Sequence, residues 1–433
     1  MTPFSAAESR LIAIRAPWAD QAAAFAPPPD DPAWAALAAA RFAEAAALAQ
    51  AEFAAEAMGA LARLAGNPAL AAELYALSPA PDARDLRNRA AAAIRGRDWS
   101  AAAADFAAGA TRAGGDADWC REGLGLLLAL AGRWRAVADL LGPPAEAEER
   151  GLGLHAHLCR IAAAHALGRD LGPDIRPGGR TPAPNAGAGD PGRTLGGDLI
   201  AFLACDPGYL HRYGFAALAA FAEAHAGAAL SVHLHLYDGD ADTAARAAHA
   251  ADRLGLALAL TGEAAPAETD VARRGAYYAC ARFCRLAEAL PRYAAPAVAL
   301  DADALVRRDL RPLVARVPAV GLATSPLSVP WNRHPAGFVV LRPGAAAQEF
   351  ADRTAALIGD SLGRGRRLWF LDQWALLIAA EAHQVRRIPA AWTYDTGFGP
   401  HTWVWQASDS RKAGDPAYLA ERNRLTAKAG IAP

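Results

Sequence analysis

The chain has 433 residues, of which 53% are hydrophobic and 21% are charged. This length is enough for two or three domains with cores of their own, which excludes a disulfide-stabilised miniprotein and a disordered chain. The 44 basic and 45 acidic residues leave a net charge of −1, so there is no positive field for a nucleic-acid backbone or an anionic membrane, and we expect neither as a partner.

Cysteine content and the first residues both bear on where the protein works. The five cysteines form no Cys-x-x-Cys pair and leave an odd thiol, which predicts neither a disulfide framework nor a thiolate zinc site. This usage indicates a reducing compartment, and we expect a cytoplasmic protein. The N-terminus includes the acidic Glu8 and has no unbroken apolar run of signal-peptide length. The apolar run at 124–132 is about half of the roughly 20 residues that a bilayer requires, so no membrane span is expected.

The first part of the chain is predicted to be helical. Residues from about 31 to 170 are dominated by Ala and Leu with interspersed Arg and Glu, and they contain few β-branched residues. The fragments RGRDWSAAAADF and LAGRWRAVADLL are alike, and their Trp99 and Trp134 lie 35 residues apart. A period near 34 is typical of stacked helix pairs and resembles tetratricopeptide repeats. We therefore predict an all-helical, repeat-like domain over 1–170, with an ordinary Ala-rich bundle as the alternative.

A composition change follows this helical part. Residues 171–194 are rich in Pro and Gly, which lower both helix and strand propensity and predict a linker or long loop. Over 195–433 short apolar strands then alternate with helices, as expected for an α/β sheet domain. The expected strands lie at 198–206, 230–240, 295–303 and 337–343, and a helix is expected at 215–227.

Three of the expected strands end in an aspartate, namely Asp206, Asp238 and Asp301. Ligands of such sheets collect beyond the carboxyl ends of the strands. In an extended segment, side chains two positions apart point the same way, so Asp301 and Asp303 could together hold a hard divalent cation. Asp-x-Asp also occurs at 116–118, 238–240 and 240–242, where a solvated turn or a helix cap is the more usual explanation.

The order of five motifs carries a family resemblance. LIAFLACDPGYLHRYG, YYACARFCRLAEALPRY, ALDADALV, WFLDQWALL and WVWQASDSRK follow one another between about residues 196 and 412. In this order they resemble a nucleotide-sugar glycosyltransferase of the GT-A fold, of the family-eight type that includes glycogenin-like and lipopolysaccharide galactosyltransferases. The resemblance implies a GT-A-type α/β domain with a Rossmann-like mixed sheet over 195–433.

The resemblance also implies residues that bind the nucleotide sugar. Asp206 and Tyr209 would lie against the nucleotide base, and Arg282 would reach the donor pocket. Lys412 would contact the diphosphate. Lys412 and Lys428 are the only lysines in the chain, and Lys412 stands where a compact ammonium suits a diphosphate better than a guanidinium does.

The metal and the transferred sugar are assigned in the same way. The resemblance implies that Asp301 and Asp303 take the metal and ribose-side roles, so that Asp301 also belongs to the donor site, and that Asp372 and Gln373 face the transferred sugar as catalytic residues. Gln406 stands where the family has a His ligand. A Gln carbonyl oxygen can bind Mg²⁺ or Mn²⁺ but is a weaker ligand than imidazole for softer metals.

The implied function is transfer of a hexose-type sugar from a nucleotide donor, most simply a UDP sugar, with retention of configuration and with Mn²⁺ or Mg²⁺ as cofactor. A repeat-like helical domain suits an extended acceptor, which predicts a protein or a cell-surface polymer as the second substrate. Because Gln406 and Pro335 depart from the family pattern, one alternative is a catalytically degenerate scaffold that only binds nucleotide or a partner. Another is metal-dependent nucleotidyl transfer, which would release pyrophosphate.

His233 and His235 alternate along the strand predicted at 230–240 and therefore share one face. Two histidines on one face can form part of a metal site. No Cys or Glu lies nearby in the sequence to complete such a site. The favoured interpretation is a pair of satisfied core histidines.

Overall fold

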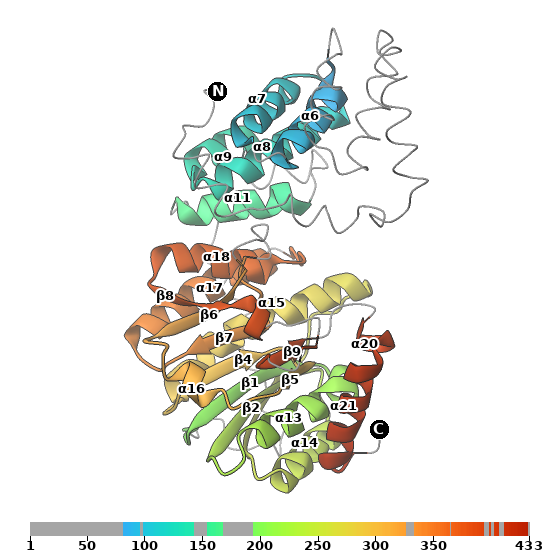
Figure 1. The fold of residues 1–433 in the computed structure, drawn as a ribbon, viewed down its shortest axis with the longest axis vertical. Coiled ribbons are helices and arrows are strands. Elements are labelled where there is room, and N and C mark those ends of the chain that lie inside the picture. The colour runs from blue at the N-terminus through green and yellow to red at the C-terminus, as the bar shows by residue number, and fades with distance from the viewer. Residues whose placement is uncertain are drawn as a thin grey trace. The chain divides into compact units, whose positions relative to one another are not determined.

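The computed structural model of the protein describes residues 81–95, 98–142, 154–167, 194–325, 333–363, 365–393, 398–399, 402–406 and 411–431. The predicted linker at 171–194 lies outside these ranges except for Thr194, and the predicted helices before residue 81 lie outside them entirely. The chain forms two compact units (Figure 1). One contains the described residues up to 167, and the other contains the sheet.

The described part of the first unit is helical. Its helices are α6 (Ala83–Arg95), α7 (Trp99–Ala110), α8 (Gly115–Leu130), α9 (Trp134–Leu141) and α11 (Leu154–Ala166). Trp99 and Trp134 each begin the second helix of a consecutive pair, α6 with α7 and α8 with α9, and the helices within each pair pack on each other. The two similar sequence fragments therefore occupy equivalent places. The repeat array itself stays a prediction.

The second unit is built on a seven-stranded mixed sheet, which confirms the predicted α/β class for its described residues. The strand order is β3-β2-β1-β4-β7-β6-β8. Strands β3, β2, β1 and β4 are parallel, β7 is antiparallel to both β4 and β6, and β8 is parallel to β6. The strands span Leu199–Cys205 (β1), Leu230–Tyr237 (β2), Ala257–Glu263 (β3), Ala297–Leu300 (β4), Val320–Thr324 (β6), Phe338–Leu341 (β7) and Val385–Pro389 (β8).

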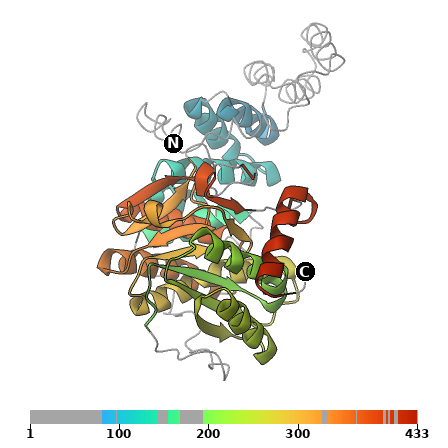
Figure 2. The same cartoon turned by 60° about the horizontal axis from the view of Figure 1, so that its bottom comes forward.

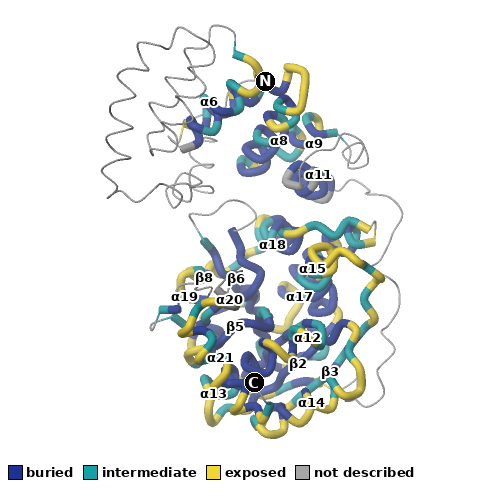
Figure 3. The backbone as a smooth tube through the Cα atoms, turned by 90° about the vertical axis from the view of Figure 1, so that its right-hand side faces the viewer, coloured by how far each residue is buried: buried dark blue, intermediate teal, exposed yellow. Residues whose placement is uncertain are grey.

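Helices complete this unit. The longer ones are α13 (Phe215–Ala224), α14 (Ala241–Arg253), α15 (Val271–Ala289), α17 (Ala345–Gly363), α18 (Leu371–Ala382) and α21 (Pro416–Lys428). The short ones are α12 (Pro207–Tyr209), the π-helical turn η1 (Leu210–Gly214), the 3₁₀ turn η2 (Leu290–Arg292), α16 (Arg311–Val314), α19 (Ala390–Thr393) and α20 (Arg411–Gly414). Helix α21 packs on α13, as Figures 1 and 2 both show, and α14 and α21 expose their outer residues (Figure 3).

Strand β2 shows how the sequence builds two layers. Its eight residues, LSVHLHLY, are all buried, so side chains on both faces of the strand are covered. The apolar Val232, Leu234 and Leu236 join the core that α13 and α14 complete. The alternating His233, His235 and Tyr237 point to the opposite face, where α15 lies. Period-two alternation thus puts a polar layer between the sheet and α15.

A second, two-stranded antiparallel sheet pairs β5 (Ala304–Val306) with β9 (Val404–Gln406). The register places Ala304 opposite Gln406, next to the end of β4. This small sheet brings a segment near the C-terminus beside the Asp301 turn. None of the described helices is long and apolar enough to cross a membrane.

Candidate active site

The segment Asp301–Asp303 forms a tight turn between β4 and β5, not the extended strand that the sequence predicted. The Ala304 amide donates to the Asp301 carbonyl oxygen at 2.9 Å, which closes the turn. The strand ends at Leu300 because the chain reverses into the two-stranded sheet. The prediction that strand alternation aligns the two carboxylates was therefore wrong. Each carboxylate is instead positioned by its own hydrogen-bond and ion-pair partners.

Asp301 is held by groups from two distant elements. Arg282 of α15 donates to Asp301 Oδ1, and the side-chain amide of Gln406 in β9 donates to Oδ2. The Arg282 Nη2 also donates to the Ala336 carbonyl oxygen at 3.2 Å. The Asp301 side chain keeps 29% of its surface exposed, against 10% for Arg282. This carboxylate is therefore the more open side of the pair.

Asp303 is almost fully buried and pairs with a cation. Its Oδ2 accepts from the Tyr209 hydroxyl at 2.7 Å and forms an ion pair with Lys412, while Lys412 Nζ also contacts the Tyr209 hydroxyl at 2.7 Å. Tyr418 of α21 donates from its hydroxyl to the Asp303 carbonyl oxygen at 2.9 Å. Burial acts to lower the pKa of Lys412, but the facing Asp303 carboxylate outweighs it and raises that pKa. Lys412 is thus a charged group inside the site.

Asp372 comes to the same place from the start of α18. Its Oδ1 accepts from the backbone amide of Gln373 at 2.9 Å, and its Oδ2 lies 3.5 Å from Arg282 Nη2. Burial raises the pKa of Asp372 to about 6, although Arg282 opposes the rise. The preceding Phe370 has a φ of 68°, a left-handed conformation that is costly for an aromatic residue and is found most often at functional sites.

Seven of the nine predicted site residues therefore form one cluster, made of two groups of side-chain contacts, one around Asp301 and one around Asp303, that the Asp301–Asp303 turn joins. They come from six segments of the chain: Tyr209, Arg282, Asp301, Asp303, Asp372, Gln406 and Lys412. The other two are placed differently. Gln373 joins through its backbone amide only. The Asp206 side chain caps α12 by accepting from the Tyr209 amide at 2.8 Å, so it fixes the turn that presents Tyr209.

The cluster contains oxygen atoms of the type that binds a hard divalent cation. Asp303 Oδ1 and Gln406 Oε1 are buried and accept no hydrogen bond from any described residue. Unpaired buried oxygen atoms are costly, and two carboxylates with an amide oxygen are the ligand type that Mg²⁺ and Mn²⁺ prefer. Within the described ranges, no group of three or more His, Cys, Asp and Glu side chains is placed to hold a metal, so any metal here depends on the Gln406 amide.

Gly337 closes the cluster from the side of β7. A Cβ atom at this position would collide with the Gln406 amide and lie 2.6 Å from Asp301 Oδ2. Only glycine leaves room here for both side chains. The residue belongs to the Pro335-Ala336-Gly337 segment in which Pro335 departs from the family pattern.

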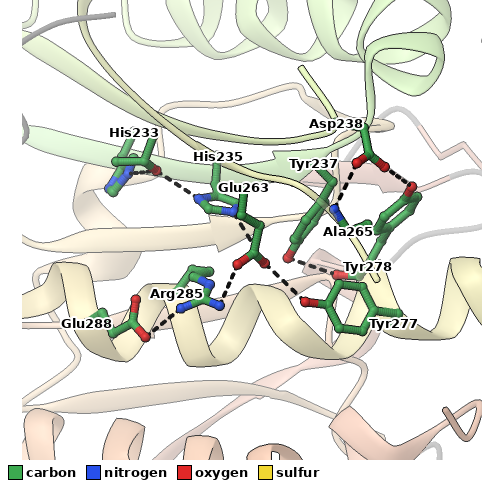
Figure 4. Close-up of polar contacts among 11 residues, drawn as sticks. His233, His235, Tyr237, Asp238, Glu263, Ala265, Tyr277, Tyr278, Arg285 and Glu288 are labelled. Carbon is green, nitrogen blue, oxygen red and sulfur yellow. Dashed lines mark hydrogen bonds and ion pairs between the residues drawn. The ribbon is translucent and has the colours of Figure 1, made fainter. Parts of the chain in front are cut away.

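The histidine pair of β2 forms a separate structural network (Figure 4). His233 contacts the Tyr293 hydroxyl at 2.6 Å and the Thr261 hydroxyl at 2.8 Å, and His235 shares the Thr261 hydroxyl at 2.8 Å. Both are 2% exposed or less. The interpretation as a satisfied core histidine is confirmed for His233, both of whose ring nitrogens have partners. His235 is buried in the core as predicted, but its Nε2 has no hydrogen-bond partner among the described residues.

Beyond these histidines lies Glu263 of β3. Its Oε2 pairs with Arg285 of α15 at 2.5 Å, and its Oε1 accepts from the Tyr277 hydroxyl at 3.3 Å and lies 3.7 Å from His235. Arg285 also reaches Glu288 at 2.6 Å. Figure 4 shows these side chains spanning the gap between the sheet and α15.

Sequence reasoning missed two groups that touch the cluster. Tyr418 carries no motif, and its contact with Asp303 depends on α21 packing against the sheet domain. Tyr213 lies one helical turn after Tyr209, and their ring centroids are 4.8 Å apart. The spacing of four residues was the available signal, since side chains at i and i+4 share a helix face.

No family model matches the chain, and no curated protein matches it. Solved structures with some similarity to the chain include glycosyltransferases by title. They include the apo form of the bifunctional enzyme WbbM (14% identity, TM-score 0.40, covering 53% of this chain and 50% of that one). They also include the galactosyltransferase LgtC with donor and acceptor sugar analogs (15% identity, TM-score 0.39, covering 53% of this chain and 95% of that one). A third is apo GlyE of Streptococcus pneumoniae TIGR4 (13% identity, TM-score 0.37, covering 55% of this chain and 65% of that one). This chain thus spans half the length of WbbM. Similarity at this level leaves the function to be argued from the site.

Proposed function

We propose that the protein is a metal-dependent glycosyltransferase of the GT-A type, which moves a hexose-type sugar from a UDP-linked donor to a protein or polymer acceptor with retention. One observation carries the proposal. Six segments spread over some 200 residues bring two carboxylates, an amide, a tyrosine, a lysine and an arginine–carboxylate pair together around the turn at the end of strand β4. Ligands of α/β sheets bind at such strand ends.

The charges suit a nucleoside diphosphate with a cation. In the part of the chain that the structure describes, Asp301, Asp303 and Asp372 form ion pairs with two cations, Arg282 and Lys412. Asp301, Asp303 and Gln406 would hold a divalent cation, which when bound supplies electrostatic stabilisation to the charge that grows on the leaving diphosphate. A half-turn of the Gln406 amide would bring its unpaired Oε1 toward the Asp301 carboxylate.

Lys412 adds a second positive charge. Its ammonium group can turn from Asp303 to a diphosphate oxygen, because Asp303 still accepts from the Tyr209 hydroxyl after the lysine leaves. A lysine is a mobile point charge on a flexible stem and suits this exchange. Tyr209 contacts both Asp303 and Lys412 and would keep the two groups aligned at the donor.

Arg282 and Asp372 would orient the sugar. Arg282 is fixed by Asp301, by the Ala336 carbonyl oxygen and by Asp372, so the Asp372 carboxylate is held in one orientation. A carboxylate fixed in this way can accept hydrogen bonds from sugar hydroxyls and stabilise positive charge at the reacting carbon. Gln373 follows it at the start of α18. The helical unit would select the acceptor.

The test is a product assay. The protein is incubated with UDP-glucose or UDP-galactose, with Mn²⁺ or with chelator, and released nucleotide and sugar are followed by NMR. We expect slow release of UDP that requires the cation, with the α-anomer formed first. Binding of UDP without any turnover would favour the degenerate scaffold instead. Release of pyrophosphate from a nucleoside triphosphate and a sugar phosphate would favour nucleotidyl transfer.

A further inference from the structure

A cavity of about 350 Å³ lies between η1 and α21. It is lined by Gly208, His211, Arg212, Arg422, Asn423 and Thr426. Helix α21 reaches this place by packing along α13 (Figures 1 and 2). The volume lies at the lower end of the range of roughly 300–1,000 Å³ that is usual for small-molecule sites. No role described above uses the cavity.

The two arginines of the cavity lack acidic partners. Among the described residues, neither Arg212 nor Arg422 forms an ion pair, and Arg422 donates only to the neighbouring Asn423 side chain, at 2.8 and 3.2 Å. Some other arginines of the same unit are paired with carboxylates, namely Arg307 with Glu421, Arg311 with Asp309, and Arg424 with Glu223. Two guanidinium groups in one cavity without a carboxylate leave a local excess of positive charge.

Three cations gather around the ring of Tyr213. Its buried ring has Arg422 at 5.8 Å, Lys412 at 5.9 Å and Arg212 at 6.0 Å from the ring centroid. Three cations around one ring benefit from its negative face, but they also repel one another. An anion in the cavity would relieve this repulsion. Within the described ranges, only Lys412 of these three cations forms an ion pair with a carboxylate, so such pairs do not explain the arrangement.

We infer that this cavity binds the phosphate group of a small phosphate ester, a ligand distinct from the nucleotide donor. Two guanidinium forks with the adjoining His211 and Asn423 offer more donors than the two oxygens of a carboxylate can use. The three terminal oxygens of a phosphate monoester match them better. The volume accommodates a sugar-sized group beside the phosphate. The site stands independently of the proposed transferase activity.

The test measures binding of glycerol 3-phosphate to the full chain by isothermal titration calorimetry, with inorganic phosphate and sulfate as further probes. We expect saturable binding of the ester, weakened about tenfold or more by Arg212→Gln and by Arg422→Gln. Arg316→Gln is the matched control, because Arg316 is exposed and has no ion pair among the described residues. That variant should bind as the wild type does. Thermal unfolding of each variant reports on its fold.

A second arm separates this site from the donor site. Saturating UDP and Mn²⁺ should leave the affinity for glycerol 3-phosphate unchanged within about twofold. Competition with UDP would assign the cavity to the donor's own diphosphate and overturn the inference. It would also be overturned if the ester does not bind, or if Arg316→Gln weakens binding as much as the cavity variants do. Because the readout is binding, loss of transferase activity does not affect the result.

Discussion

Arg282 and Arg285 lie three residues apart on α15, and each is buried between two carboxylates. Arg282 faces Asp301 and Asp372, whereas Arg285 faces Glu263 and Glu288. The two surroundings differ in their oxygen atoms. Both carboxylate oxygens of Glu263 have partners, but the cluster around Arg282 leaves Asp303 Oδ1 and Gln406 Oε1 without one among the described residues.

This difference distinguishes the buried charges of a candidate active site from those of a structural network. A buried ion pair alone is weak support for function, because structural networks bury charges too. The Glu263 side chain is only 9% exposed, whereas Asp301 keeps 29% of its side chain open. Unmet oxygen atoms next to an accessible carboxylate are the setting in which we propose a cation. The network around Arg285 instead holds the sheet to α15.

The largest effect should come from Asp303→Asn. Loss of one charge-stabilising partner typically lowers turnover by a factor on the order of 10² to 10³, and we expect that loss in UDP release from a sugar donor. Asp242→Asn is the matched control, since Asp242 also belongs to an Asp-x-Asp triplet but lies exposed on α14 beside Arg246. Near-normal turnover by Asp303→Asn would remove Asp303 from the mechanism.

The network around Arg285 should respond in stability and not in turnover. Glu263→Gln leaves the buried Arg285 with only the exposed Glu288, and breaking a buried pair costs about 3 kcal/mol. Urea unfolding should show this loss, while turnover per folded molecule stays unchanged. Glu288→Gln removes the other partner, which is 54% exposed, and should cost less than about 1 kcal/mol. Equal losses of unfolding free energy in the two variants would contradict the distinction between the buried and the exposed partner of Arg285.

The histidines of this network predict a pH dependence of stability. Burial lowers the pKa of His233 to about 3, and it also lowers the pKa of His235. The histidines of the unfolded chain titrate near pH 6.5. Below that pH the unfolded chain therefore binds protons that the folded chain does not bind. The stability that the two neutral histidines contribute to the folded state is therefore present above pH 6.5 and is lost as the pH falls toward 3.

For His233 alone, the expected loss between pH 7 and pH 5 is about 2 kcal/mol. Urea unfolding at the two pH values measures it, and His233→Gln should make the dependence shallower. A wild-type stability that stays constant over this interval would show that the histidines are not held neutral by burial.

The smallest effect is expected at Gly337, whose hydrogen faces the Gln406 amide. The methyl group of Gly337→Ala would displace Gln406 and Asp301, and displacing the support of a metal ligand typically weakens metal binding by about tenfold. Titration with Mn²⁺ measures the change. Gly115→Ala, where a Cβ meets nothing within 4 Å, is the control. Unaltered Mn²⁺ affinity in the Gly337 variant would place the metal elsewhere.

Four of the five inner strands of the sheet, β1, β2, β4 and β7, were predicted from the sequence, but the inner strand β6 and the two edge strands were not. Strand β2 is a run of apolar residues and histidines because both of its faces are covered. Strands β3 and β8 lie at the two edges. The segments ALALTGE and VRRIP have several exposed or half-buried positions and so lack a clear strand pattern. An edge strand packs against one neighbour only, which weakens its apolar signal.

The candidate site could be predicted residue by residue only through the family resemblance. Residue types and spacing singled out Asp301 and Asp303 but gave no reason to join them to Lys412 or Gln406, which lie more than 100 residues away. Those pairings arise from β9 adding to β5 and from α20 following it. The resemblance also could not give the turn at Asp301, which depends on the two-stranded sheet.

Calorimetric titration of the protein with UDP, in the presence of Mn²⁺ and then of chelator, tests the central claim most directly. If Asp301, Asp303 and Gln406 hold a cation beside the diphosphate, UDP should bind at least about tenfold more tightly with Mn²⁺, and Asp301→Asn should abolish the difference. Binding of UDP that is equally strong with and without the cation would contradict the account, as would a complete absence of UDP binding by the wild-type protein.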